Sequence, residues 1–379
     1  MIEIFNKYCI SIIGHELPAH EVIIISISLL FVFVFFITIS SVFLLRSFKI
    51  VRERNLLKFK QEIEQEMADY LFSDHANFKT WLNAHLEFEK KYKRILNRAF
   101  LRNAFIEVLI NLHKSFSGEY AIKIENLYVE LHFYTDSQKK LNTSTWYIKA
   151  KGISEISHMK YNPLYEDVYK FINAPHALLR NEVQMALLIF KKGEGLSFLD
   201  DYKFIISEWQ QVCLMDILLK SEKTVNINPA WLKSKNESVV SLALKIVRGY
   251  QILNYTHELL PLLSHANENI VKETIVTLGE IQDISAKELL LTLFYQFNTA
   301  QKKEALKALV YLSSDEDIPF FTELLFSADN QIALQAAIAI KKSSSNGPQV
   351  LTELMEHNAN SERIIRIIKH VLDPLIVRE

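Results

Sequence analysis

A 31-residue period runs through the C-terminal third of this 379-residue chain, and few folds can produce it. Four columns repeat at that step: Val239, Ile270, Gln301 and Ile332; Ala243, Thr274, Ala305 and Ala336; Ile246, Thr277, Ala308 and Ala339; and Val247, Leu278, Leu309 and Ile340. At helical spacing each unit places mostly small residues at positions i and i+3 and a large apolar residue at i+4 on a single helix face. Bulk in the small columns would push neighbouring helices apart. The period therefore predicts a stack of closely packed helices.

The pattern extends upstream and alternates with other apolar segments. One further unit lies roughly two periods before Val239 and contains Leu179, Val183, Ala186 and Leu187. Cys213 is predicted to fall in the small column of the unit between. Four intervening segments end in short polar loops: 258–263, 287–297, 319–326 and 349–357. Each unit is thus predicted to be helix, turn, helix, turn. A lone pair cannot bury its apolar face, whereas a stack can, which predicts an all-α protein built as an α-solenoid.

One unit carries a family resemblance. The segment ELLPLLSHANENIVKETIVTLGEI, residues 258–281, resembles a HEAT repeat, with Pro261 in its first helix. The second-helix pattern of this family is matched by Ile270, Thr274, Thr277, Leu278 and Gly279. Residues 179–188 and 301–312 resemble the same stretch. The resemblance covers about residues 120–375 and implies stacked antiparallel helix pairs. Other armadillo-like or TPR-like repeats are the near alternatives.

Two parts of the HEAT pattern are incomplete. The basic residue of the family's second helix is matched by Arg180 and Lys302, but it is replaced elsewhere by Val240, Val271 and Ala333. The loop aspartate of the family is also often missing. The stacking is still expected, whereas a continuous Asp–Arg ladder is not.

A charge-free apolar run precedes the repeats. Residues 22–45 contain no charge over 24 positions. A helix of that length spans about 36 Å, and about 30 Å of hydrocarbon must be crossed. We therefore predict one transmembrane helix. A buried soluble helix would rarely run this long without a polar face. A cleaved signal peptide would need a basic start and a small-residue cleavage site, and neither is evident.

The charges after this run predict its orientation. Six cations follow it, opposed only by Glu53: Arg46, Lys49, Arg52, Arg54, Lys58 and Lys60. The positive-inside rule places that flank in the cytoplasm. We therefore expect a short extracytoplasmic tail at residues 1–21, and a juxtamembrane helical region at 46–117 with a HEAT-like domain at 118–379, both cytoplasmic. Residue usage rich in Ile, Lys, Asn and Phe suggests an AT-rich bacterial genome, so we expect this membrane to be a bacterial inner membrane.

The juxtamembrane region is predicted to be helical, with a break at Ser117–Gly118. An apolar stripe at three- and four-residue spacing comprises Leu56, Phe59, Ile63, Met67 and Tyr70. A second basic cluster comprises Lys90, Lys91, Lys93, Arg94, Arg98 and Arg102. Both basic clusters could rest on anionic headgroups, where each cation contributes about 1 kcal/mol. An ordinary solvated helix face is the other interpretation.

Composition and motifs argue against several function classes. The net charge is −1, with no basic field or aromatic platform for nucleic acid. Nucleotide-binding, hydrolase, zincin and calcium-loop motifs are missing from the sequence. We expect no cofactor, no metal, no small-molecule substrate and no enzymatic activity. The four tryptophans, Trp81, Trp146, Trp209 and Trp231, are predicted to pack in the core or between helices.

The expected function is that of a membrane-anchored scaffold or adaptor, because HEAT solenoids usually bind proteins on the surface formed by their second helices. Candidate partner-binding residues on that surface are Lys245, Arg248, Glu273, Glu280, Lys303, Lys307, Lys341 and Lys342. This mixed, lysine-rich set would suit an acidic patch on a protein associated with the membrane. The alternatives are a lipid-binding peripheral regulator that uses the basic clusters, or an enzyme on a HEAT-like fold.

Overall fold

The computed structural model describes residues 19–75, 77–221, 224–343, 345–357 and 361–374. Within these ranges it contains helices α2 to α20 and seven short 3-10 segments, and no strand. The predicted all-α class is confirmed. The described ranges leave out most of the predicted tail, residues 1–21. Contacts divide the chain into two compact units, one ending at Asp136 and one beginning at Ser137.

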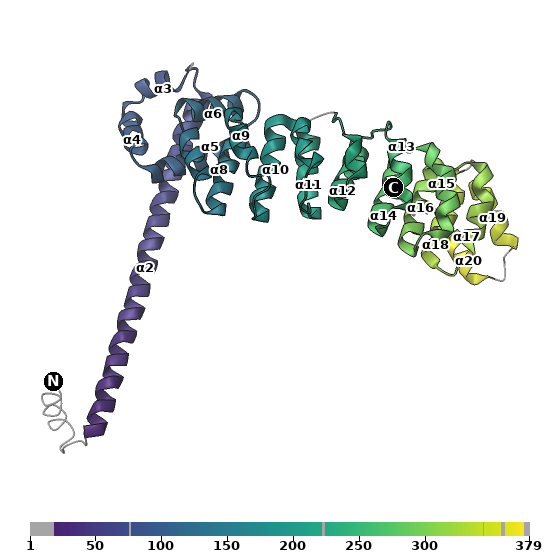
Figure 1. Cartoon of the computed structure of the whole chain (residues 1–379), viewed down its shortest axis with the longest axis horizontal. Helices are drawn as coiled ribbons and strands as arrows, with labels where there is room; N and C mark the ends of the chain where they lie inside the picture. Colours follow the sequence, from purple (N-terminus) through teal and green to yellow (C-terminus); the bar gives the residue numbers. More distant parts are fainter. Residues whose placement is uncertain (1–18, 76, 222–223, 344, 358–360, 375–379) are drawn as a thin grey trace. The chain divides into compact units, whose positions relative to one another are not determined.

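The first unit is built around one very long helix. Its helices are α2 (Ala19–Phe72), α3 (Phe78–Ala84), α4 (Leu86–Leu96), α5 (Ala99–Ser115) and α6 (Glu119–Glu130), and it ends within α7 (Tyr134–Leu141). Helix α2 runs unbroken for 54 residues (Figure 1). Among the described residues it is the one helix that is long and apolar enough, by length and composition, to cross a membrane.

Only the C-terminal end of α2 packs into the unit. Ile63, Met67 and Tyr70 are buried, and Leu56 and Phe59 are half-buried, as the apolar stripe predicted. This face contacts α5 and α6. Other aromatic rings surround Tyr70, including Phe78 and Trp81. The same aromatic group includes Tyr92, whose pKa is raised to about 12 by burial and secondarily by the charge of Glu130.

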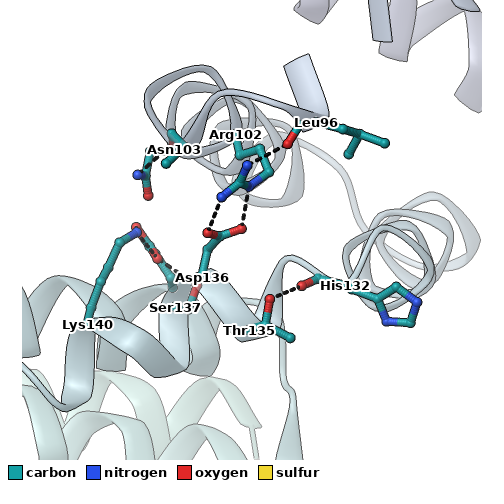
Figure 2. Close-up of polar contacts among 10 residues, drawn as sticks. Leu96, Arg102, Asn103, His132, Thr135, Asp136, Ser137 and Lys140 are labelled. Carbon is teal, nitrogen blue, oxygen red and sulfur yellow. Dashed lines mark hydrogen bonds and ion pairs between the residues drawn. The ribbon is translucent and has the colours of Figure 1, made fainter. Parts of the chain in front are cut away.

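A half-buried arginine joins α5 to α7. The Arg102 guanidinium donates from Nε to Asp136 Oδ2 at 2.8 Å and from Nη2 to Oδ1 at 2.9 Å, and also to the carbonyl of Leu96 (Figure 2). The hydrogen bonds to Asp136 raise the pKa of Arg102. A bidentate pair of this kind fixes orientation as well as distance. Arg102 is therefore committed to the fold rather than available to a lipid surface.

The predicted break is present between α5 and α6. Gly118 has a φ of +64°, a left-handed conformation that favours glycine. The contacts nevertheless divide the chain after Asp136, so this break lies inside the first unit. The domain boundary proposed at 117–118 stays a prediction.

The second unit consists of paired helices. Its α-helices are α8 (Trp146–His158), α9 (Tyr165–Tyr169), α10 (Ala177–Lys191), α11 (Glu208–Ser221), α12 (Glu237–Gly249), α13 (Thr256–Leu259), α14 (Glu268–Glu280), α15 (Lys287–Leu293), α16 (Thr299–Leu312), α17 (Ile318–Leu325), α18 (Asn330–Ser343), α19 (Gly347–His357) and α20 (Glu362–Leu372). Its 3-10 segments are η1 (Asn162–Leu164), η2 (Lys192–Asp200), η3 (Pro229–Lys233), η4 (Leu260–Ser264), η5 (Ile284–Ala286), η6 (Phe294–Gln296) and η7 (Asp315–Asp317).

The repeat columns form the core of this unit. All residues of the four columns, which lie on α12, α14, α16 and α18, are buried. Helix α14 packs against α12 and α16, and α16 packs against α18 (Figure 1). Close approach of α14 to α16 depends on Gly279, because a Cβ atom there would lie 2.6 Å from the Cβ of Ala308. The small residues therefore serve the packing that the period predicted.

The predicted register of α11 is wrong by one residue. The buried positions of this helix are Gln210, Gln211, Leu214 and Leu218, whereas Cys213 is half-buried. Of these, Gln210, Leu214 and Leu218 follow Leu179, Val183 and Leu187 by one full period. The next step, to the equivalent residues of α12, is shorter by two positions. The midpoint between Val183 and Ala243 is Cys213, so two equal steps predict Cys213 in the small column. The actual steps are unequal, and Leu214 takes that position. The polar Gln210, in a column that is mostly apolar, gave no sign of the shift.

The tryptophan prediction holds in part. Trp81 and Trp231 are buried in the core. Trp146 is partly exposed but stacks on His176, with ring centroids 3.6 Å apart. Trp209 is 75% exposed, so the prediction that it packs inside is wrong. The corrected register of α11 explains this, because Gln210 occupies the buried column and Trp209 precedes it.

Candidate functional site

The eight predicted partner-binding residues lie on α12, α14, α16 and α18, and each is half-buried or exposed. The structure separates them into three groups according to what each side chain contacts. One group bridges α12 and α14, and a second lines grooves around α16, to which Glu280 of the first group also contributes. Lys341 contacts the end of α20.

The α12–α14 group is an internal ion-pair network. Lys245 Nζ lies 3.1 Å from Glu273 Oε1 and donates to Gln211 Oε1 at 2.6 Å. Arg248 Nε lies 3.6 Å from Glu280 Oε2. Through Gln211, this network also includes α11. Lys245 and Glu273 pair directly across α12 and α14, whereas Glu273 Oε2 is buried without a hydrogen-bond partner. These contacts join successive helices.

The lysines around α16 are less completely neutralised. Lys307 pairs with Glu304 of its own helix at 3.1 Å, and Lys303 lies 3.9 Å from Asp329. Lys342 lies 5.9 Å from the ring centroid of Tyr311, a long cation–π distance. Exposed pairs of this kind contribute about 0–1 kcal/mol. Their positive charge therefore remains available to an acidic ligand.

Lys341 serves a structural purpose. Its Nζ donates to the carbonyl of Val371 at 2.6 Å, near the end of α20. A cation at a helix C-terminus complements the helix dipole and satisfies an unpaired carbonyl. Lys341 therefore fastens α20 to α18 and does not line the grooves beside Lys342.

Two adjoining grooves lie among α14, α16 and α18, and we call them together the lysine groove. One has a volume of about 330 Å³ and the other about 620 Å³. They share Glu304, Lys307 and Gln335. Other residues of the lining include Lys272, Val276, Lys303, Tyr311, Leu334, Ile338 and Lys342. Lys272 and the apolar floor were not among the predicted site residues, although Lys272 and Lys303 occupy equivalent positions of successive repeats.

An asparagine ladder runs along the starts of the repeat helices. Asn236, Asn267 and Asn298 are N-caps at equivalent positions of three successive repeats, and each side chain accepts an N–H hydrogen bond from its own helix. Asn267 Nδ2 also donates to Glu237 at 2.6 Å, and Asn298 Nδ2 donates to Glu268 at 2.9 Å. Each of these two caps thereby links its helix to the preceding repeat helix.

Asp329 continues the ladder at the start of α18. Its Oδ1 accepts the N–H of Gln331 at 2.7 Å, and this hydrogen bond is the largest cause of its lowered pKa. A second N–H, from Ile332, and the charges of Lys303 and Arg363 act in the same direction. An asparagine or aspartate occurs once per repeat, directly before an apolar run. This pattern is typical of helix N-caps, and the sequence-based prediction did not include it.

Arg180 makes contacts that differ from an Asp–Arg ladder. Its Nη1 donates to the carbonyls of Ala174 at 2.7 Å and Pro175 at 2.9 Å. The guanidinium carbon lies 3.9 Å from the ring centroid of Phe204. Arg180 thus fastens two loops against the start of α10.

Among the described residues, no group of three or more His, Cys, Asp or Glu side chains is placed to hold a metal ion. His85 stacks on Trp81, and its Nε2 lies 3.4 Å from Asp69 Oδ2.

Comparison with known proteins leaves the family open. No family model matches the chain, and no curated protein matches it. A solved structure described as an engineered protein is similar to it, with 15% sequence identity and a TM-score of 0.36, covering 82% of this chain and 87% of that chain. A likeness at this level carries no argument about function. The HEAT resemblance stays a prediction.

Proposed function

We propose that this chain is a membrane-anchored, non-catalytic scaffold in which a HEAT-like α-solenoid binds protein partners at the cytoplasmic face of the membrane. The observation that carries the proposal is the lysine groove, whose lining contains four lysines and two glutamates, Glu280 and Glu304, over an apolar floor. Three further lines of evidence support it: the exposed apolar length of α2, the burial of the repeat columns, and the placement of the basic clusters.

The membrane anchor is supported by what α2 exposes. Its apolar half includes Phe31, Phe43 and Leu45, each about 70% exposed, and the most apolar window of α2 is not buried by any described residue. A core helix of a soluble protein would be mostly buried. Each large apolar side chain left in water costs about 1.5–3 kcal/mol relative to burial. A bilayer removes that cost and needs a helix of this length.

The solenoid is supported by the repeated packing. Each of α12, α14, α16 and α18 buries the same four columns and contacts the next repeat helix. A stack in which each unit contacts its neighbours is the defining property of solenoid proteins. Such stacks present extended surfaces, and the lysine groove spans three successive repeat helices.

The chemistry of the lysine groove favours an acidic protein partner. Lys272 has no ion-pair partner among the described residues, and Lys342 faces an aromatic ring. The apolar floor of the lysine groove includes Val276, Ile338 and Tyr311, which is 57% exposed. A partner that covers this floor would gain the buried contacts that dominate binding energy. The cations would favour association with acidic surfaces and select against basic ones.

A lipid-binding regulator is a weaker candidate. Lys91 of the second basic cluster pairs with Glu62, which lies about 25 Å beyond Leu45 along α2. The Debye length at physiological salt is about 8 Å, so a cluster at that height would feel little of the lipid charge. Of the cluster, Lys93 also pairs with Glu89, and Arg102 is held by Asp136.

The first basic cluster is better placed to contact lipid. Lys60 pairs with Glu107, and Arg52 lies 4.9 Å from the ring centroid of Phe100. Within the described residues, Arg46, Arg54 and Lys58 have no ion-pair partner. Cations directly after an apolar span would anchor and orient it. Lipid contact would thus serve the anchor.

The test is affinity purification of the full chain in mild detergent. A Lys303→Glu/Lys307→Glu variant should lose the specific partner that the native chain retains. The matched control is Lys139→Glu/Lys233→Glu, which makes the same charge change at lysines outside the groove and should retain the partner. Equal recovery from all three proteins, or recovery of the bait alone under every growth condition, would refute the proposal.

A further inference from the structure

A row of exposed apolar side chains crosses the start of the second unit. Tyr147, Leu178 and Trp209 each occupy the second position of α8, α10 and α11, at equal steps of one repeat period. All three are more than half exposed, and Trp209 is 75% exposed. The equivalent positions of the later repeat helices are polar or small: Ser238, Asn269, Ala300 and Gln331.

Specific contacts hold the three helix starts side by side. Trp146 stacks on His176, which joins the start of α8 to the start of α10. Gln210 Nε2 donates to the carbonyl of Asn181 at 3.2 Å, which joins the start of α11 to the first turns of α10. Helices in contact lie about 8–10 Å apart, so the row is a fixed surface about 20 Å long.

Ile205, which is 83% exposed, precedes Trp209 by four residues in the chain. The segment that carries it is held on both sides. Phe204 lies under the Arg180 guanidinium, and the N–H of Ile206 donates to Ser238 Oγ at 2.9 Å. Asn236 Nδ2 donates to the carbonyls of Tyr202 and Phe204. Ile205 is thus presented to solvent by an ordered segment.

An acidic groove of about 1180 Å³ has in its lining both Ile205 and Glu208, the residue directly before Trp209. Its lining contains two lysines, Lys203 and Lys235, and five carboxylates: Asp200, Asp201, Glu208, Glu237 and Glu273. Asp201 and Glu208 have no ion-pair partner among the described residues. The apolar row therefore borders a net negative surface, in contrast to the lysine groove.

We propose that this surface is a second docking site, which binds a basic amphipathic helix of a partner protein. Apolar residues at seven-residue spacing on a helix lie about 10.5 Å apart, close to the spacing of α8, α10 and α11. A partner helix would place successive apolar side chains on Tyr147, Leu178 and Trp209. Its lysines or arginines would face Asp201 and Glu208. The charge of the groove selects this partner over an acidic helix.

The experiment uses the full chain in zwitterionic nanodiscs and two labelled synthetic helices. Both have leucine at the same seven-residue spacing, and they differ only in having lysine or glutamate at the polar positions. Fluorescence anisotropy should show that the lysine peptide binds, and that Trp209→Ala raises its Kd about tenfold or more. Asp201→Asn/Glu208→Gln should also weaken binding. The control Tyr295→Ala removes a similarly exposed aromatic ring elsewhere and should leave Kd unchanged.

Three outcomes would overturn the inference. One is an affinity for the lysine peptide that does not depend on Trp209. Another is a glutamate peptide that binds as tightly as the lysine peptide. The third is a change in oligomeric state of the Trp209→Ala protein by native mass spectrometry, which would assign the row to a second copy of this chain. Lys307→Glu should not change the Kd of the lysine peptide. The proposal for this second docking site can therefore fail or succeed independently of the proposal for the lysine groove.

Discussion

The side-chain amide of Asn267 donates a 2.6 Å hydrogen bond to Glu237, the first residue of the preceding repeat helix. Its Oδ1 accepts the N–H of Asn269 and caps α14. One side chain thus caps its own helix and binds the previous one. An aspartate at this position could form the cap but would repel Glu237. The contact with Glu237 therefore favours asparagine over aspartate here.

Substitution of Asn267 should separate the two contacts. Asn267→Ala loses the cap and should destabilise the unit by about 1 kcal/mol. Asn267→Asp keeps the cap but opposes two carboxylates, so it should destabilise at pH 7 and recover as carboxyl groups are protonated at about pH 4. Chemical unfolding monitored by circular dichroism measures both effects. Addition of Glu237→Gln to Asn267→Asp should restore stability at pH 7; failure to do so would mean that the contact with Glu237 contributes nothing.

Two glycine-to-alanine substitutions should change the free energy of unfolding in opposite directions. In Gly279→Ala the new Cβ meets the Cβ and Cα of Ala308 at under 3 Å, so α14 must move away from α16, at a cost of about 1–3 kcal/mol. In Gly249→Ala the nearest atom is Met215 Cε, the end of a flexible side chain, so the helix-propensity gain of up to about 1 kcal/mol should prevail. Unfolding midpoints measure both changes. A stabilising Gly279→Ala would contradict the close approach.

The cap at Asp329 should make stability depend on pH. Its pKa is lowered from the ordinary value of 3.8, chiefly by the N–H of Gln331. A carboxyl group whose pKa is lower in the folded state than in the unfolded state stabilises the fold. The stabilisation is complete at pH values above the unfolded-state pKa, and it is lost as the pH falls through the folded-state pKa. The difference in unfolding free energy between the native chain and Asp329→Ala, about 0.5–2 kcal/mol at pH 7, should therefore shrink between about pH 5 and pH 2. A constant difference would exclude this linkage.

Nitroxide labels should locate the membrane relative to α2. With Cys9 and Cys213 replaced by serine, single labels are introduced as Arg46→Cys and Arg94→Cys in nanodiscs that contain anionic lipid. The label at 46 should be relaxed by oxygen, which concentrates in lipid, and the label at 94 by a water-soluble reagent. If oxygen relaxes both labels, the second basic cluster lies on lipid and the regulator hypothesis gains support. If neither label responds to oxygen, α2 is not inserted.

The periodicity of the sequence predicted which columns of the repeat helices are buried. It did not predict the register of α11, which depends on the length of the neighbouring loops. Burial of Ala243, Thr274 and Ala305 follows from a constant step that packing enforces at each unit. The shorter step from Gln210 to Val239 breaks that regularity, because the loops set it rather than the core. The exposed Trp209 was missed for the same reason, since an aromatic residue within one position of a buried column looks like core.

The charged side chains show a second limit. Lys245 and Glu273 lie on the expected helices, α12 and α14, and their ion pair joins those helices. Which charged side chains pair with one another depends on the distances between helices, and periodicity does not encode those distances. The sequence could therefore propose a charged surface but could not separate its structural ion pairs from the lysine groove.

The most direct test of the central claim is site-specific photo-crosslinking in intact cells, with benzoylphenylalanine in place of Tyr311 in the lysine groove or Tyr295 outside it. These tyrosines are 57% and 56% exposed, so their access to solvent is matched. A discrete adduct should form at position 311, be recovered from the membrane fraction and be lost with Lys303→Glu/Lys307→Glu. No such adduct should form at position 295. The same adducts at both positions, or none at 311, would contradict the central claim.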